Sequence, residues 1–241
     1  DGIGACLILR LGGIVSGNDF YSTPALSPDG STLAWLTWNH PHRPWDGTEL
    51  WAGELDDRGN LLSSTRVAGG RSESIIQPRW SPDGTLYFIS DRGGWWNLYR
   101  WRNGGIEPVL EMDAEFGKPQ WLFGMSTYGF DDAARIVCTY CRQGEWHLGL
   151  VDVSAGTLEP VDTGFSVIDS VCATGGRVLF LGGAPDRFGA VVQLDLHSQR
   201  LTVMRRASSL DLDTRYLSVP KVLSFPTEDG WDAHGFYYAP A

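Results

Sequence analysis

The chain has 241 residues, of which 42% are hydrophobic and 20% charged, as in an ordinary globular protein. Its formal net charge of −10 argues against nucleic acid and against an anionic membrane as partners, because both are bound through basic patches. The 11 Trp and 30 Gly residues indicate many short strands joined by tight turns, with aromatic side chains between sheets.

The first residues form an apolar stretch, Ala5–Val15, that contains Arg10 and is too short to cross a bilayer. It also lacks the basic region and the cleavage site of a signal peptide. Because the chain begins with Asp1 and not with Met, we expect it to be a piece of a longer protein. A strand around Ala5–Leu11, within a segment 1–20, would be the remnant of a preceding repeat unit.

An apolar run recurs along the chain at intervals of 53, 50 and 42 residues. The four copies begin at Leu33, Leu86, Ile136 and Val178. No segment repeats apolar residues at helical spacing over a dozen residues, so helix should be nearly absent. A period of 40 to 50 residues is typical of β-propellers, in which each unit is one blade.

The second unit shows the pattern of a blade most clearly. It predicts four short strands, Ile75–Trp80, Thr85–Ser90, Trp96–Trp101 and Ile106–Leu110. The predicted fold class is therefore all-β, with about four propeller blades of four antiparallel strands each. We place these blades at about residues 21–70, 71–114, 115–164 and 165–209.

A Ser-Pro-Asp-Gly turn occurs twice, at Ser27–Gly30 and Ser81–Gly84. Ser can bond back to the backbone, Pro presets φ near −65°, and Gly accepts the positive φ that ends the turn. We interpret the tetrapeptide as the structural connection between the first and second strands of a blade, and it is degenerate in the later units.

The four cysteines are expected to have a structural role, with a redox or metal role as the weaker alternative. The Cys138–Cys141 spacing resembles a redox or metal motif, but the surrounding residues alternate as a strand, and residues three apart on a strand point to opposite faces. We interpret the cysteines as core residues or free thiols. A cytoplasmic location is preferred, with export as the alternative, and no cofactor or metal is predicted.

Three segments carry a resemblance to a known family. They are Asn18–Trp51, the stretch RWSPDGTLYFISDRGGWWNLYRW at Arg79–Trp101, and YLSVPKVLSFPTEDGWDAHGFYYAP at Tyr216–Pro240. They resemble the propeller repeat that is shared by TolB-type proteins and the prolyl oligopeptidase family of serine peptidases. The first and third favour the peptidases: the first resembles a blade of acylaminoacyl-peptidase-like and dipeptidyl-peptidase-like members, and the third resembles the junction with an α/β-hydrolase domain.

This resemblance implies a propeller of seven or eight blades, of which the chain holds only part. Residues 216–241 would be the linker and the first hairpin of an absent α/β-hydrolase domain in the same polypeptide. The closest approaches to its Gly-x-Ser-x-Gly motif, at Ser126 and Ser166, both lack the second glycine. None of the five His residues is a credible member of a catalytic triad, so the chain alone should hydrolyse nothing.

The function implied by the resemblance is that of a noncatalytic propeller that admits only short peptides to the Ser-His-Asp site of the hydrolase domain. The alternative is a free-standing TolB-like or WD-type propeller that binds a protein or ligand. Incomplete blades expose their edges, so a homo-oligomer through these edges is a further expectation.

The long connection Asn39–Gly47 is the first candidate site, with His42, Arg43, Trp45 and Asp46 as candidate substrate- or domain-facing residues. Hairpin loops usually need two to five residues, so the extra length needs a reason. The loop either faces the catalytic domain or the substrate, or covers a hydrophobic edge. A metal site through the histidines is the weakest alternative, since no carboxylate cluster accompanies them.

The second group of candidates follows a strand of the second unit. Arg92 is predicted to be a turn residue that pairs with an acid. Trp95 and Trp96 either stack on a substrate or pack between blades, and alternation predicts one in the core and one on the surface.

Overall fold

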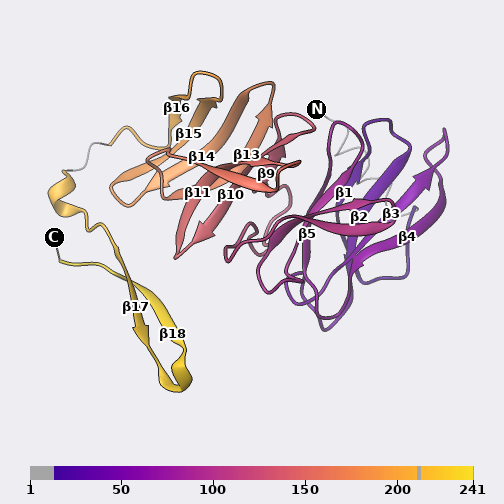
Figure 1. Ribbon diagram of the computed structural model, residues 1–241, viewed down its shortest axis with the longest axis horizontal. Coiled ribbons are helices and arrows are strands. Elements are labelled where there is room, and N and C mark those ends of the chain that lie inside the picture. Colours follow the sequence, from indigo (N-terminus) through magenta and orange to yellow (C-terminus); the bar gives the residue numbers. More distant parts are fainter. Residues whose placement is uncertain (1–13, 211–212, 241) are drawn as a thin grey trace.

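The computed structural model describes residues 14–210 and 213–240. Its strands form four antiparallel four-stranded sheets and one two-stranded hairpin (Figure 1). The first sheet contains β1 (Phe20–Leu26), β2 (Thr32–Trp38), β3 (Glu49–Leu55) and β4 (Leu61–Gly69), in this order. The second contains β5 (Ile75–Trp80), β6 (Leu86–Ser90), β7 (Asn97–Arg102) and β8 (Gly105–Leu110).

The third sheet contains β9 (Tyr128–Phe130), β10 (Arg135–Arg142), β11 (Glu145–Asp152) and β12 (Thr157–Val161). The fourth contains β13 (Val167–Thr174), β14 (Arg177–Ala184), β15 (Arg187–Asp195) and β16 (Arg200–Arg206). The hairpin consists of β17 (Lys221–Pro226) and β18 (Asp232–Tyr237). Two short 3-10 turns, η2 (Thr214–Tyr216) and η3 (Glu228–Gly230), are the helical elements of the described residues.

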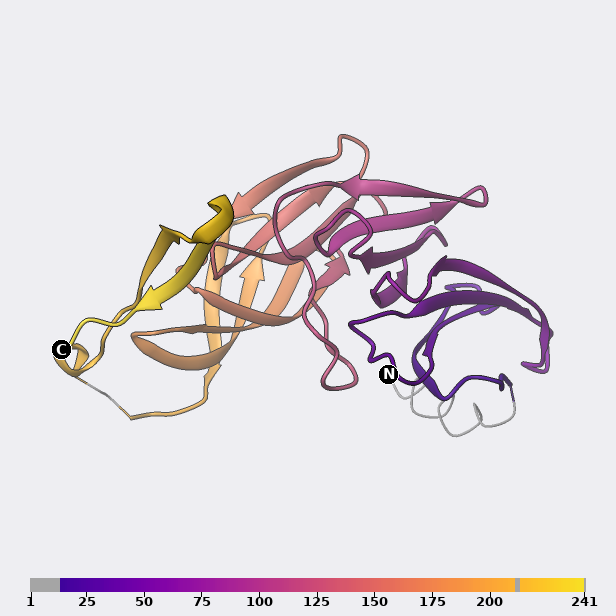
Figure 2. The same cartoon turned by 90° about the horizontal axis from the view of Figure 1, so that it is seen from below.

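The predicted all-β fold with four-stranded antiparallel sheets and almost no helix is confirmed. The sheets follow one another along an arc, from the indigo first sheet to the orange fourth sheet (Figures 1 and 2). The strand expected at Ala5–Leu11, together with Cys6, lies outside the described residues. No helix of residues 14–210 and 213–240 is long and apolar enough to span a membrane.

The second strand of the second sheet explains why the sheets stack. Leu86 and Phe88 of β6 belong to a buried cluster shared with the first sheet. Tyr87 and Ile89, which point to the opposite face, belong to a cluster shared with the third sheet. Because both faces are buried, this strand is a continuous apolar run rather than an alternating one. A third cluster joins the third and fourth sheets through residues such as Phe180.

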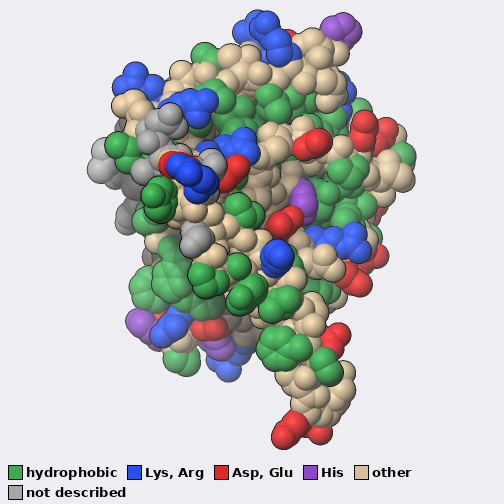
Figure 3. All heavy atoms as spheres, turned by 90° about the vertical axis from the view of Figure 1, so that its left-hand side faces the viewer, with side chains coloured by type: hydrophobic (Ala, Val, Ile, Leu, Met, Phe, Trp, Pro, Cys, Tyr) green, Lys and Arg blue, Asp and Glu red, His purple; other side chains and the backbone are tan. Residues whose placement is uncertain are grey.

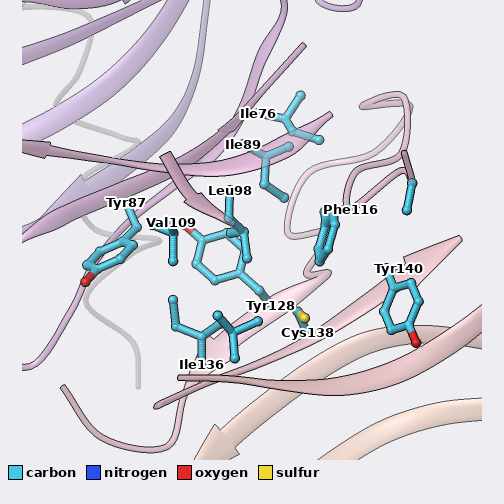
Figure 4. Packing of buried hydrophobic residues seen from close by; sticks show 12 residues of the cluster. Ile76, Tyr87, Ile89, Leu98, Val109, Phe116, Tyr128, Ile136, Cys138 and Tyr140 are labelled. Carbon is cyan, nitrogen blue, oxygen red and sulfur yellow. The ribbon is translucent and has the colours of Figure 1, made fainter. Parts of the chain in front are cut away.

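Figure 4 shows the apolar side chains of the cluster between the second and third sheets, and hydrogen-bonded polar groups lie among and beside them. The hydroxyl of the fully buried Tyr128 donates to the backbone oxygen of Gln77 at 2.9 Å. The amide of Gln77 donates to the backbone oxygen of Tyr128 at 2.9 Å, and its oxygen accepts from the backbone N–H of Thr127 at 2.8 Å. Burial raises the pKa of the Tyr128 hydroxyl, so this group stays protonated and continues to donate.

The two Ser-Pro-Asp-Gly turns join the first and second strands of their sheets, as predicted. In the first turn the Ser27 hydroxyl donates to Asp29 at 2.6 Å and accepts from the Thr32 N–H at 2.9 Å. These and further hydrogen bonds lower the pKa of Asp29 to about 2. Gly30 takes a φ of +76°, which a residue with a side chain adopts at a cost.

The three described cysteines are free thiols, as predicted. Cys138 is buried in the cluster between the second and third sheets, and this burial raises the pKa of its thiol. Cys141 is half-buried, and its backbone pairs with that of Glu115. Cys172 is exposed.

The fourth sheet buries one face and exposes the other. Val178 and Phe180 of β14 pack toward the third sheet. Leu179 and Leu181 alternate with them and are 42% and 47% exposed. They occupy the positions at which Tyr87 and Ile89 of β6 are covered by the next sheet. Figure 3 looks at the side of the molecule that carries this sheet and the hairpin, and green hydrophobic side chains extend over much of it.

The two faces of β14 predict different responses to truncation. Phe180 is 1% exposed, so Phe180→Ala should lower the free energy of unfolding by about 3–5 kcal/mol, through lost burial and the cavity left behind. Leu181→Ala, one position away on the open face, should cost about 1 kcal/mol or less. Urea denaturation followed by Trp fluorescence measures both values. Equal losses would contradict the assignment of the two faces.

Candidate functional site

The connections β2–β3, β6–β7 and β10–β11 and the segment before β9 gather at one end of the stacked sheets. We call residues 39–48, 91–96, 111–127 and 143–144 the loop end. Strand direction alternates in each sheet, so every second connection lies at the same end. Backbone contacts join these segments from sheet to sheet: the Phe116 N–H donates to the Trp96 oxygen at 2.7 Å, and the Cys141 N–H to the Glu115 oxygen at 2.8 Å. All candidate residues from the sequence therefore lie at the loop end.

The connection Asn39–Gly47 is held in place by its own hydrogen bonds and by Asp19. The Asp19 N–H donates to Asn39 Oδ1 at 2.7 Å, and the His40 N–H donates to Asp19 Oδ2 at 2.9 Å. Within the loop, the Arg43 N–H donates to Asp46 Oδ2 at 2.9 Å. The Asp46 carboxylate thus orders the turn, and the loop is a defined structure on a rigid scaffold.

Trp45 connects this loop to the segment that precedes β9 of the third sheet. Its ring lies 4.4 Å from that of Trp121, centroid to centroid, at an interplanar angle of 47°. The Arg43 guanidinium lies 5.8 Å from the Trp45 ring centroid, within the range of a cation–π contact. The Pro44 oxygen accepts a hydrogen bond of 2.9 Å from the Ser74 hydroxyl. The loop therefore bridges the first two sheets and the segment that enters the third.

The partner of Trp45 belongs to an exposed apolar segment. Trp121, Leu122 and Phe123 are 72%, 75% and 84% exposed, and they follow one another in the chain. Three consecutive large apolar side chains open to water are unusual for a loop, and such patches mark surfaces that bind another molecule or domain. Trp45 and this segment together form the aromatic patch: Trp45, Trp121, Leu122 and Phe123.

The second group of candidate residues has mainly structural contacts. Arg92 pairs with Glu73 at 2.8 Å, which confirms the predicted pairing with an acid, and lies 5.3 Å from the Tyr99 ring centroid. Trp95 is 42% exposed, whereas Trp96 packs against the core between the second and third sheets, as alternation predicts. The indole N–H of Trp96 is buried without an acceptor.

The candidates thus separate into two sets. Arg43 and Trp45 come together with the aromatic patch, whereas His42 is half-buried and donates its backbone N–H to the Asn39 oxygen at 3.0 Å. Among the described residues no three His, Cys, Asp or Glu side chains are grouped as a metal site.

A cavity of about 230 Å³ lies beside the loop end, between the first strands of the first two sheets and the segment before β9. The first strands bulge here, with positive φ at Thr23 and Gln77. Its polar lining residues are Thr23, Gln77, Arg79, Lys118, Gln120 and Thr127.

Sequence reasoning missed both the aromatic patch beyond Trp45 and the cavity. One signal was present: Lys118-Pro-Gln-Trp121 repeats the pattern of Gln77-Pro-Arg-Trp80, yet Leu122 and Phe123 follow in place of a Ser-Pro-Asp-Gly turn. The structure uses residues 128–130, not 118–121, as the first strand of the third sheet. Without this turn, the segment forms an exposed loop in place of a strand.

The hairpin β17–β18 also contacts the loop end. The Phe236 ring lies directly against Gly144 in the β10–β11 turn, where any side chain at Gly144 would overlap with the ring. Gly144 has a φ of +83°, which suits glycine as well. Apolar side chains of the hairpin, such as Phe225 and Trp231, are exposed. The hairpin is therefore a second apolar surface at this end.

No protein-family model and no curated protein matches the chain, but solved structures do. A puromycin hydrolase is 30% identical, with a TM-score of 0.85 over 93% of this chain and 34% of that protein. A puromycin-hydrolyzing peptidase from Mycobacterium tuberculosis is 32% identical, with a TM-score of 0.86 over 93% of this chain and 34% of that protein. The chain spans about a third of the length of these proteins.

Prolyl oligopeptidase B from Galerina marginata has the same fold, at 15% identity and a TM-score of 0.71, over 92% of this chain and 31% of that protein. The matching part of these proteins is their N-terminal β-propeller domain. The class of protein is thus a partial β-propeller. More specifically, the predicted resemblance to the propeller portion of the prolyl oligopeptidase family is confirmed.

Glu115 gives the loop end a pH dependence. Its carboxylate accepts a hydrogen bond of 2.9 Å from the Trp96 N–H, but burial, with a smaller contribution from the charge of Asp91, raises its pKa. A raised pKa means that the folded state binds the proton more tightly, so this group costs stability as pH rises above its ordinary range. The free energy of unfolding of Glu115→Gln, compared with that of the wild type, should therefore increase as the pH rises.

Chemical denaturation at several pH values measures this difference. Glu111→Gln, at an exposed carboxylate of the same segment, is the matched control for the substitution itself. A Glu115→Gln difference that does not change with pH would refute the assignment.

Proposed function

We propose that the chain is the noncatalytic propeller of a peptidase whose catalytic Ser-His-Asp site lies in an α/β-hydrolase domain of the same polypeptide. The observation that carries this proposal is the place of hairpin β17–β18: Phe236 contacts Gly144 at the loop end, where the aromatic patch is also exposed. Residues 216–241 are then the linker and first hairpin of the catalytic domain. The 30–32% identity to a puromycin hydrolase and a puromycin-hydrolyzing peptidase supports peptide-like substrates.

The loop end is proposed to face the catalytic site and to limit access to short peptides. A stack of sheets with buried clusters is rigid, so a chain that must pass it has to be short or unfolded. His42, Arg43, Trp45 and Asp46 would form part of this wall, with Arg92, Trp95 and Trp96 behind it. Acylaminoacyl- or dipeptidyl-peptidase specificity and a cytoplasmic location remain part of this proposal.

The first test compares the full polypeptide with the 241-residue chain, using chromogenic aminoacyl substrates. We expect turnover by the full polypeptide only. In the full polypeptide, Trp121→Ala should lower kcat/KM about tenfold or more, because removal of a central aromatic anchor costs about 2 kcal/mol.

Leu62→Ala is the matched control, since Leu62 is 66% exposed at the start of β4, at the opposite end of its sheet. It should leave kcat/KM unchanged. Turnover by the 241-residue chain alone would overturn the proposal, and so would a full polypeptide without peptidase activity, which favours a free-standing binding propeller.

The gate is tested by substrate length. Replacing residues 40–46 by a short Gly-Ser turn should raise the hydrolysis of an unfolded peptide of about 30 residues relative to a tripeptide, because the wall is lowered. The ratio of the two kcat/KM values measures this effect. If the ratio stays the same while both substrates are cleaved, the loop does not limit access.

A further inference from the structure

The cavity between the first strands of the first two sheets contains an arginine whose charge is balanced by no carboxylate of residues 14–210 and 213–240. Arg79 of β5 lines this cavity and is half-buried. Its Nη2 donates to the Ser126 hydroxyl at 3.0 Å, and its guanidinium lies 5.9 Å from the Tyr128 ring centroid. The Ser126 hydroxyl in turn donates to the Val171 oxygen at 2.5 Å. Arg79 is thus held by neutral groups.

The other half-buried cations of the described residues are balanced by acids. Arg100 pairs with Glu107 at 2.8 Å, and Lys118 with Asp169 at 3.1 Å. Within residues 14–210 and 213–240, every other Lys or Arg that forms no ion pair is exposed. A charge taken from water without a counter-ion is costly, and in a chain with a net charge of −10 an acidic partner would be easy to supply.

The donors that remain at the cavity favour an anion. A guanidinium has five N–H donors and only one of those of Arg79 is engaged by a described group. Lys118, which lines the same cavity, donates to the Ile168 oxygen at 3.2 Å and to Asp169, and its ammonium lies 4.1 Å from the Trp146 ring centroid, so one of its three donors makes no hydrogen bond to a described group. The amide of Gln77, by contrast, donates one of its two N–H groups to the Tyr128 oxygen, and its oxygen accepts from the N–H and the hydroxyl of Thr127.

The shape of the cavity favours the end of a peptide over a larger ligand. Its volume of about 230 Å³ is below that of most drug-sized sites. Pro24, Pro78 and Met125 supply apolar walls next to the cations. A planar carboxylate matches the guanidinium fork through two parallel hydrogen bonds, which a spherical ammonium cannot offer.

We propose that Arg79, assisted by Lys118, binds the terminal carboxylate of a short peptide in this cavity. The cavity then recognises one end of a peptide that has entered at the loop end. That the ligand is a peptide rests on the proposed function, whereas the recognition of a carboxylate rests on the cavity alone.

Isothermal titration calorimetry of the full chain with triglycine, triglycine amide and inorganic phosphate tests this proposal. We expect triglycine to bind and its amide to bind at least tenfold more weakly, since the amide lacks the charge. Arg79→Gln should weaken triglycine binding tenfold or more, and Arg66→Gln, at an exposed arginine of β4, should not. Thermal unfolding checks that Arg79→Gln is folded.

Three outcomes would overturn the proposal: no binding of triglycine, equal binding of acid and amide, or unchanged binding by folded Arg79→Gln. Phosphate binding without triglycine binding would replace it with a general anion site. The comparison of acid and amide on the wild type keeps the test valid even if Arg79→Gln does not fold. If triglycine binds more tightly than its amide but the full polypeptide hydrolyses no peptide, only the proposed function fails. If the full polypeptide hydrolyses peptides but binds acid and amide equally, only this inference fails.

Discussion

Each inner sheet of this molecule is apolar on both faces, and it is stable only with a neighbour on each side. In β6, Leu86 and Phe88 need the first sheet, and Tyr87 and Ile89 need the third. Burial of apolar area on both faces is the main favourable contribution to folding here, because isolated four-stranded sheets would leave half of these side chains in water. The arrangement of the sheets follows from this requirement.

Stacking also brings together residues that are remote in sequence. Trp45 and Trp121 contact each other only because the first sheet packs on the second, and the second on the third. The same stacking places the bulged first strands beside one another and leaves the cavity of Arg79 between them. The loop end and the cavity are therefore consequences of the inter-sheet clusters, and loosening these clusters would change both.

The repeat units and their turns were readable from the sequence, because they depend on local patterns. The strand predicted at Ile75–Trp80 has the same bounds in the structure, since a turn with Pro and Gly ends it clearly. The role of Trp121 was not readable, because its neighbours look like a first strand. The sequence also did not show that Arg79 has no acid beside it among the described residues, because the neighbours of Arg79 come from other sheets. Local chemistry defines the units, and the site arises between them.

The open face of β14 has a consequence for how such molecules change over time. Leu179 and Leu181 stand where Tyr87 and Ile89 stand in β6, so successive sheets present the same kind of surface in the same direction. A duplicated unit would find a compatible surface on either neighbour without any new interface having to arise. The number of blades can therefore differ between such proteins while each junction keeps the same kind of contact.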